Sequence, residues 1–344
     1  MTENRVRYAV IGTEGIGQHH MDGIKKNPKT SVLTAVCDNV EEYAKKAADK
    51  NGLDKYYTDY RDMLRDGGFD CVVVATPDQA HMEQCIASLE AGYHVLCEKP
   101  LAMYEYELDA IVEAAKKSDK KFMVGQVGRK TPSFILAKQL VDEGVIGDLF
   151  FVESEYAHDY SILKRGEWRK DPNYLRHAVV GGGCHAMDLL RWIAGNPTEV
   201  TAYANHKVLT DWPVDDCTIA ILKYPNNVIG KVFTSIGCKR PYTMRTVLYG
   251  NKGTMIFDNK TPELTVYHQV YYREEDKYQY PATVYPVQIN NHNMTGEIED
   301  MSKAILEDLT IELDACEGAN TVSVCLAAVK SAAEGGPVVP KYYN

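Results

Sequence analysis

The chain has 344 residues, which is long for one hydrophobic core, so two domains are expected. Its 45% hydrophobic and 25% charged residues are ordinary for a globular protein, and 48 acidic against 38 basic residues give a net charge of −10. Because no run rich in Lys or Arg stands out, neither nucleic acid nor an anionic membrane is expected as a partner.

The nine cysteines are scattered, contain no Cys-x-x-Cys pair, and in several cases lie inside apolar runs. This pattern favours a reducing compartment over a disulfide framework. The first residues show no apolar signal region, and no apolar run of about 18 residues occurs. The sequence therefore predicts a soluble, cytoplasmic protein.

The first 124 residues alternate short strand patterns with helical ones. Strands are expected at residues 7–11, 31–37, 56–57, 69–75, 93–97 and 122–124. One helix is expected to follow the glycines after the first strand and to end at about residue 27. Further helices are expected at residues 40–50, 59–65, 79–91 and 105–117. Apolar, β-branched runs separated by helices of this length are typical of βαβ units. Residues 1–124 are therefore predicted to form a Rossmann domain, with a doubly wound parallel sheet that binds a dinucleotide.

The pattern changes in residues 125–344. After a helix at about 132–143, strands are expected at residues 149–156, 199–206, 218–224, 228–236, 243–249 and 264–271. Pro225-Asn226-Asn227 predicts a hairpin turn, and two helices close the chain near residues 294–309 and 315–334. We expect an α+β domain with a large, mostly antiparallel open sheet that binds the substrate and mediates oligomerisation.

A glycine-rich turn, Gly12-Thr13-Glu14-Gly15-Ile16-Gly17, follows the first strand and opens a helix. Such a turn lets backbone N–H groups and the helix N-terminus approach a pyrophosphate. Glu14 stands at the middle glycine of the G-x-G-x-x-G pattern, so Gly15 would take over its role in a shifted turn. An ordinary tight turn between strand and helix is the alternative interpretation.

Asp38 ends the second strand, 21 positions after Gly17. A carboxylate at this point binds the adenosine ribose hydroxyls and repels a 2′-phosphate, which favours NAD over NADP. An Asp that caps the following helix is the alternative.

Two motifs follow neighbouring strands of the predicted parallel sheet. Ala75-Thr76-Pro77-Asp78 leads to His81, and Cys97-Glu98-Lys99-Pro100-Leu101 comes after the next strand. Both are expected at the carboxyl edge of the sheet, where doubly wound folds bind ligands. The proline holds Lys99 in an extended conformation, which aims its side chain from a stiff backbone.

These motifs resemble the glucose–fructose oxidoreductase / inositol dehydrogenase (Gfo/Idh/MocA) family, whose signature is Glu-Lys-Pro at this point. The resemblance covers nearly the whole chain. It includes Gly128-Arg129-Lys130-Thr131-Pro132, Trp168-Arg169, Gly183-Cys184-His185-Ala186-Met187-Asp188, and an ending that runs from Glu317-Gly318 to Val338.

The resemblance implies that Lys99 contacts the substrate hydroxyl and the nicotinamide ribose, while His185 takes the hydroxyl proton. Histidine supplies a base with a pKa near neutrality, and lysine supplies a cation for the developing alkoxide. The cofactor is expected to bind along residues of the first domain, namely Gly12, Gly15, Ile16, Gly17, Asp38, Thr76, Pro77, Asp78, His81, Glu98, Lys99 and Gln126.

The chain departs from the family at Gly181. Many members carry an Asp four residues before the histidine, so here the expected triad becomes a dyad. His177 or Asp188 are candidates to compensate. The weaker substrate-binding candidates are Tyr156, His158, Trp168, Arg169, His177 and Asp188.

Glu153, Glu155 and His158 lie close together in the sequence, which could indicate a metal site. The two glutamates share one face of a strand, whereas His158 would fall on the other face, so the three do not converge. No metal is expected.

The leading hypothesis is an NAD(P)-dependent dehydrogenase, with NAD preferred, that acts on a secondary hydroxyl (CH–OH) of a sugar, glycoside or inositol. Redox-assisted glycoside cleavage with tightly bound NAD is an alternative, and a non-catalytic NAD-binding sensor is another. The unpaired face of the open sheet predicts a homodimer or homotetramer.

Overall fold

The computed structural model describes residues 5–163, 167–268 and 280–344. The chain divides into two compact units. The first contains Met1–Val127, Asn293–Val322 and Tyr342–Asn344, and the second contains Gly128–His292 and Ser323–Lys341. The chain leaves the first unit at residue 127, near the expected boundary at 124. It also returns there at residue 293, which the sequence analysis did not predict.

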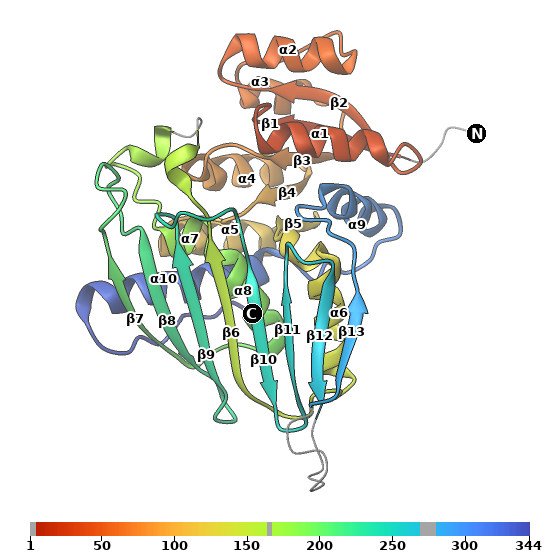
Figure 1. Ribbon diagram of the computed structural model, residues 1–344. Helices are drawn as coiled ribbons and strands as arrows, with labels where there is room; N and C mark the ends of the chain where they lie inside the picture. Colours follow the sequence, from red (N-terminus) through yellow and green to blue (C-terminus); the bar gives the residue numbers. More distant parts are fainter. Residues whose placement is uncertain (1–4, 164–166, 269–279) are drawn as a thin grey trace, which may run out of the picture. The chain divides into compact units, whose positions relative to one another are not determined.

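A five-stranded parallel sheet forms the centre of the first unit (Figure 1), in the order β2-β1-β3-β4-β5. Its strands are β1 (Val6–Ile11), β2 (Ser31–Cys37), β3 (Cys71–Val74), β4 (His94–Glu98) and β5 (Phe122–Gly125). Apolar side chains dominate these strands because helices cover both faces of the sheet. The predicted Rossmann fold is confirmed.

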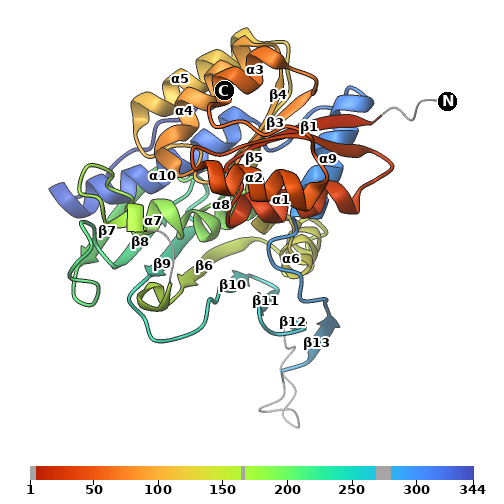
Figure 2. The same cartoon turned by 90° about the horizontal axis from the view of Figure 1, so that it is seen from above.

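Helices cover the two faces of this sheet, with α1, α2 and α9 on one side and α3, α4 and α5 on the other (Figure 2). Their bounds are α1 (Ile16–Lys26), α2 (Glu41–Asn51), α3 (Tyr60–Asp66), α4 (His81–Glu90), α5 (Glu105–Lys117) and α9 (Met294–Leu306). Short 3-10 turns lie at Asp78–Ala80 and Val127–Lys130.

Helix α9 explains why the chain returns to the first unit. Its Ile298 and Met301 are fully buried in the same hydrophobic cluster as Val10 and Leu96 of the sheet. Its Ser302 hydroxyl lies 2.8 Å from the hydroxyl of Tyr8. Without α9 this part of the sheet would expose apolar side chains to water, so the first unit is completed by residues from the far end of the sequence.

The strand expected at residues 56–57 is reduced to a single parallel bridge between Tyr57 and Cys37. Two backbone hydrogen bonds hold it, from Tyr57 to Val36 and from Asp38 to Tyr57. The segment does not extend because Asp59 already caps α3 by accepting from the backbone N–H of Arg61. The expectation of a third strand at residues 56–57, and with it of six strands in this sheet, was therefore wrong.

An eight-stranded sheet dominates the second unit, in the order β13-β12-β11-β10-β6-β9-β8-β7. All neighbouring pairs are antiparallel except β6 and β9. The strands are β6 (Leu149–Ala157), β7 (Glu199–Asn205), β8 (Cys217–Lys223), β9 (Ile229–Ser235), β10 (Arg245–Gly250), β11 (Gly253–Asp258), β12 (Glu263–His268) and β13 (Ala282–Pro286). The predicted, mostly antiparallel open sheet is confirmed.

The sequence analysis missed β11 and β13. Strand β13 is almost entirely exposed, so it carries no alternation of buried and exposed side chains that a pattern could reveal. The hairpin between β8 and β9 lies where it was predicted, with Asn227 at a φ of 59°. Positions 269–271 of the expected last strand lie outside the described residues.

Helices line one face of the eight-stranded sheet. They are α6 (Pro132–Asp142), α7 (Ala178–Gly181), α8 (Cys184–Ala194) and the long α10 (Ala315–Glu334). Short 3-10 turns lie at Tyr160–Ile162 and Glu167–Lys170, between β6 and α7. Helix α8 packs on β6 and β9. On β6, Val152, Ser154 and Tyr156 are therefore buried, whereas Glu153 and Glu155 lie on the opposite face.

All nine cysteines are free thiols, as the scattered pattern predicts. Across residues 5–163, 167–268 and 280–344, no helix has both the length and the apolar character that a bilayer-spanning segment needs.

Candidate functional site

The loop between β1 and α1 approaches its neighbours so closely that only glycine fits. A Cβ on Gly12, whose φ is 86°, would lie 2.6 Å from the carbonyl oxygen of Ala75, and one on Gly17 would lie 1.8 Å from that of Gly12. Gly15 is the N-cap of α1, with a φ of 56°, and offers no side-chain cap. The N–H of Gly17 donates to the carbonyl oxygen of Glu14 at 3.1 Å, and no side chain caps the N-terminus of the helix, which is the end where phosphates bind in such turns.

Glu14, which departs from the glycine pattern, forms an ion pair with Lys46 of α2 at 3.6 Å. Asp38 is bound to the same loop from the end of β2. Its Oδ2 accepts hydrogen bonds from the backbone N–H and the hydroxyl of Thr13, at 2.9 and 3.0 Å, and its Oδ1 accepts from the N–H of Val40. Asp38 therefore holds the turn before α2 without capping the helix, whose N-cap is Val40 and has no side-chain cap. Its carboxylate is placed beside the glycine loop, where a ribose would bind.

His81 joins the two loops that follow β3 and β4. It is fully buried, with Nε2 3.1 Å from the carbonyl oxygen of Thr76 and Nδ1 3.0 Å from that of Pro100. The Thr76 hydroxyl donates to Gln84 of α4 at 2.7 Å. These contacts hold the backbone just before Pro77 and just after Lys99, whose peptide bond to Pro100 is cis.

A buried histidine and carboxylate anchor the peptide of Lys99. Glu98 accepts a hydrogen bond from the N–H of Lys99 at 3.1 Å and lies 2.7 Å from Nε2 of His20. Burial alone would raise the pKa of Glu98, but the hydrogen bond and charge of His20, aided by Lys99, hold that pKa below its usual range. Sequence reasoning missed this role of His20, although its place on the buried face of α1 offered a signal.

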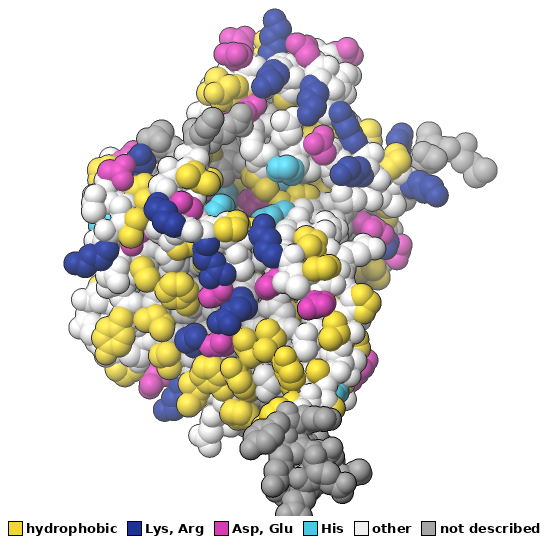
Figure 3. All heavy atoms as spheres, in the orientation of Figure 1, with side chains coloured by type: hydrophobic (Ala, Val, Ile, Leu, Met, Phe, Trp, Pro, Cys, Tyr) yellow, Lys and Arg dark blue, Asp and Glu magenta, His cyan; other side chains and the backbone are white. Residues whose placement is uncertain are grey.

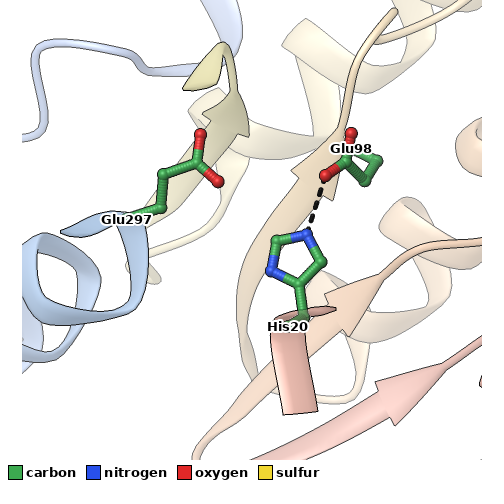
Figure 4. A group of neighbouring side chains, drawn as sticks. All are labelled: His20, Glu98 and Glu297. Carbon is green, nitrogen blue, oxygen red and sulfur yellow. Dashed lines mark hydrogen bonds and ion pairs between the residues drawn. The ribbon is translucent and has the colours of Figure 1, made fainter. Parts of the chain in front are cut away.

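Glu297 of α9 lies on another side of the same imidazole (Figure 4). Ligand atoms of His20, Glu98 and Glu297 lie within 4.8 Å of one another, and within the described residues they form the one such group of three. The His20–Glu98 distance is a hydrogen bond, shorter than the roughly 3.3 Å between two ligands of a tetrahedral zinc ion. His20 and Glu98 are therefore spaced as hydrogen-bonding partners rather than as zinc ligands, and Glu98 in turn holds the backbone N–H of Lys99.

Gln126 follows β5 and is only 1% exposed. Within the described part of the chain, neither atom of its side-chain amide has a hydrogen-bond partner. A buried amide without partners is costly, so this position suits a ligand that supplies a donor and an acceptor. Together with the glycine loop and Asp38, it makes the first unit a fitting dinucleotide site.

In the second unit, His185 lies in the first turn of α8 inside a cluster of aromatic rings. It is 4% exposed, and its ring centre lies 6.2 Å from that of Tyr156 and 5.9 Å from that of His292. The Tyr156 hydroxyl lies 3.0 Å from that of Tyr160 and 3.3 Å from Nδ1 of His158. Two of the predicted substrate residues, Tyr156 and His158, thus lie in the cluster of His185.

Sequence reasoning missed three members of this cluster, namely Tyr160, Tyr242 and His292. Tyr160 begins the 3-10 turn after β6, whereas Tyr242 and His292 come from separate loops, and nothing in their local sequence pattern distinguishes them. Burial lowers the pKa of His158, which favours its neutral form, and raises the pKa of Tyr156 well above its usual value. At neutral pH both rings can therefore hydrogen-bond without carrying charge.

Glu153, Glu155 and His158 do not converge in the structure. Glu153 forms an ion pair with Lys231, and Glu155 with Arg240 at 3.2 Å, on the face of the sheet opposite the helices. His158 lies beyond the end of β6 among the aromatic rings.

Two family models match the chain. Residues 6–126 match the oxidoreductase family with an NAD-binding Rossmann fold, and residues 134–256 match the GFO/IDH/MocA C-terminal domain. The chain belongs to the GFO/IDH/MocA family. It is an oxidoreductase of that family with an NAD-binding Rossmann domain.

Several of the similar proteins are dehydrogenases by name. The myo-inositol 2-dehydrogenase of Thermotoga maritima is 28% identical over 74% of this chain and 75% of its own length. The levoglucosan dehydrogenase of Pseudarthrobacter phenanthrenivorans is 26% identical over 67% of this chain and 66% of its own. A levoglucosan dehydrogenase solved with NADH shares the fold, with a TM-score of 0.89, 24% identity, and coverage of 99% of this chain and 100% of that one.

The departure from the GFO/IDH/MocA pattern at Gly181 has a structural counterpart. A Cβ on Gly181 would lie 2.1 Å from Nη1 of Arg176, whose Nη2 donates to the carbonyl oxygen of Gly181 at 3.3 Å. The next glycine, Gly182, makes room in the same way for the ring of Tyr156. A buried guanidinium therefore occupies the space that a side chain at position 181 would need.

The two candidates to compensate for the family carboxylate missing at Gly181, Asp188 and His177, have the following surroundings. Both oxygens of Asp188 accept hydrogen bonds from Arg129 at 2.8 Å, in an ion pair that is almost fully buried. His177 is the N-cap residue of α7, and burial lowers its pKa. Trp168 and Arg169 lie against each other, with the guanidinium 4.7 Å from the ring centre and 6.0 Å from that of Tyr160.

Proposed function

We propose that this protein is an NAD-dependent dehydrogenase that transfers a hydride from a secondary hydroxyl of a sugar, glycoside or inositol. The observation that carries the proposal is a buried imidazole, His185, held among hydroxyl-bearing rings in a chain that also has an NAD-binding Rossmann domain. The names of the similar inositol and levoglucosan dehydrogenases support this substrate class.

In the proposed reaction His185 removes the hydroxyl proton and Lys99 stabilises the developing alkoxide by its positive charge. Bound NAD supplies the hydride acceptor. Glu98, His20 and His81 position Lys99 by fixing the backbone around it.

NAD is proposed as the preferred cofactor over NADP because of Asp38. Its carboxylate is fixed by Thr13 and Val40 and would repel a 2′-phosphate.

The test is the production of NADH with a panel of inositols, hexoses and glycosides, comparing wild type with Lys99→Ala and His185→Ala. Each variant should lose at least about 100-fold in kcat/KM without a loss of thermal stability. Lys117→Ala, on the exposed surface of α5, is the matched control and should keep full activity. Full turnover by Lys99→Ala would refute the assigned role. Release of an aglycone without net NADH would instead indicate redox-assisted cleavage, and tight NAD binding without any turnover would indicate a sensor.

We further propose a homodimer or homotetramer that buries the outer face of the eight-stranded sheet. On this face Tyr203, Ile219, Ile221, Ile229 and Ile256 are each more than a third exposed. Figure 3 shows hydrophobic side chains gathered over these strands, around a central group of charged ones. An exposed apolar area of this kind on a sheet is a common site of subunit association.

A further inference from the structure

His292 has a backbone conformation that few residues other than glycine adopt. Its φ is 58°, and in the described ranges Asn227 and Asp308 are the other non-glycine residues with a positive φ. Asn227 lies in the hairpin between β8 and β9, and Asp308 lies in the turn after α9, where Asn and Asp are common. His292 instead precedes α9 and carries a ring. A strained backbone of this kind persists where surrounding contacts fix it, and such residues are concentrated at functional sites.

Hydrogen bonds on both sides of His292 fix this conformation. The side-chain amide of Asn291 donates to the carbonyl oxygen of Asn259 at 2.8 Å. Asn259 is buried, and its side-chain oxygen accepts from the N–H of Met244 at 2.7 Å. On the other side, Asn293 caps α9 by accepting from a backbone N–H of the first turn at 3.2 Å. The chain is therefore anchored immediately before and immediately after the strained histidine.

The ring of His292 lies against His185 in the aromatic cluster of the second unit. The two ring centres are 5.9 Å apart and their planes are inclined by 79°. The ring of Tyr242 lies on His292 as well, with a centre-to-centre distance of 5.5 Å. His185 is buried, whereas His292 is exposed to solvent. Two imidazoles at this separation are close enough to exchange a proton directly or through one water molecule.

The proposed reaction needs a route by which a proton leaves. Oxidation of a CH–OH group by NAD yields NADH, a carbonyl product and one proton, and His185 holds this proton. A buried base must return to its neutral form before it can act again. Burial raises the pKa of Tyr156, which stacks on His185, and of Tyr242, so neither phenol gives up its proton near neutral pH. An imidazole gains and loses a proton in this range.

We propose that His292 is the proton outlet of His185, receiving the proton that His185 takes from the substrate hydroxyl and passing it to bulk water. This inference rests on the proposed dehydrogenase function. The carbinol carbon gives its hydride to NAD, and the hydroxyl proton moves to His185, then to His292 and finally to solvent. The product is the ketone, and both imidazoles end the cycle neutral. The anchored loop serves to hold one exposed imidazole beside the buried one.

The test uses His292→Gly and His292→Asn, with a polyol that wild type oxidises, in weak buffer at neutral pH. Glycine adopts a positive φ freely and Asn tolerates it, so neither variant should melt below wild type. Each should lose about 10-fold or more in kcat. Added imidazole should restore kcat in a saturable manner, because a small base then takes the proton from His185. His268→Asn is the control, a histidine of β12 whose Nε2 lies 2.8 Å from the Thr283 hydroxyl, and it should keep wild-type kcat throughout.

Stopped-flow measurement of NADH separates a proton outlet from a general disturbance of the site. In the variants the first turnover should run at the wild-type rate, since His185 starts neutral, and only later turnovers should slow. An unchanged kcat, a loss that imidazole does not restore, a slowed first turnover or a lower melting temperature would each overturn the inference. If wild type itself forms no NADH with any polyol, both proposals fail. If wild type turns over and the variants match it, only the outlet fails.

Discussion

The buried ion pair between Arg129 and Asp188 offers the sharpest test of the second unit. Their side chains are only 4% and 3% exposed, and two hydrogen bonds of 2.8 Å join them. Arg129→Met removes the cation and leaves the carboxylate buried in place. Breaking a buried pair from one side costs about 3–5 kcal/mol, because the remaining charge is neither solvated nor paired as before.

For domains of this size the melting temperature falls by about 2–4 °C per kcal/mol, so Arg129→Met should lower it by roughly 6–20 °C in calorimetry or circular dichroism. The double variant Arg129→Met/Asp188→Leu should recover most of this loss, because replacing both partners by apolar residues leaves no unpaired charge buried. Lys138→Met removes a more exposed pair with Asp142 on α6 and should cost less than about 1 kcal/mol.

The reasoning would be refuted if Arg129→Met lost less than about 1 kcal/mol, or if the double variant lost as much as the single one. Asp188→Asn adds a functional readout. If Asp188 replaced the family carboxylate missing at Gly181, this variant would lose kcat and keep its stability. We expect instead that Asp188→Asn loses stability and keeps kcat.

Three further outcomes are expected. Glu98→Gln should destabilise the protein most above about pH 4.5, and the difference in melting temperature from wild type should shrink at lower pH. The reason is that a carboxylate whose pKa is lowered in the folded state stabilises the fold above its unfolded-state pKa. It loses this contribution as the pH falls through its folded-state pKa. A pH-independent deficit in melting temperature would contradict this. Asp38→Ser should raise the kcat/KM ratio of NADP to NAD by about 10-fold or more, whereas an unchanged ratio would remove Asp38 from the ribose site. Ile221→Glu should lower the molar mass measured by light scattering from that of an oligomer to that of a monomer. A wild-type protein that is monomeric at micromolar concentration would refute the proposed oligomer.

Much of the first unit was predictable because its signals are local. The glycines at 12, 15 and 17, the carboxylate of Asp38 and the Glu98-Lys99-Pro100 motif each follow a strand of a parallel sheet. In such a sheet the strand ends meet at one edge, so chain order alone places these residues together. The hairpin between β8 and β9 was likewise visible in its turn residues.

Other features depend on contacts between residues far apart in sequence, and no periodicity reports them. Helix α9 completes the first unit from beyond residue 292, and His20 meets Glu98 across 78 positions. Tyr242 and His292 join the ring cluster of His185 from separate loops.

Gly181 shows most directly what the sequence determined and what only the tertiary structure decided. The sequence alone revealed that a family carboxylate is missing at this position. Only the folded chain revealed that the guanidinium of Arg176 fills the space that a side chain there would need, because the loop carrying Arg176 folds back over a residue that has no Cβ. Local chemistry therefore identified the departure from the family pattern, whereas the packing of the loop decided which group fills that space.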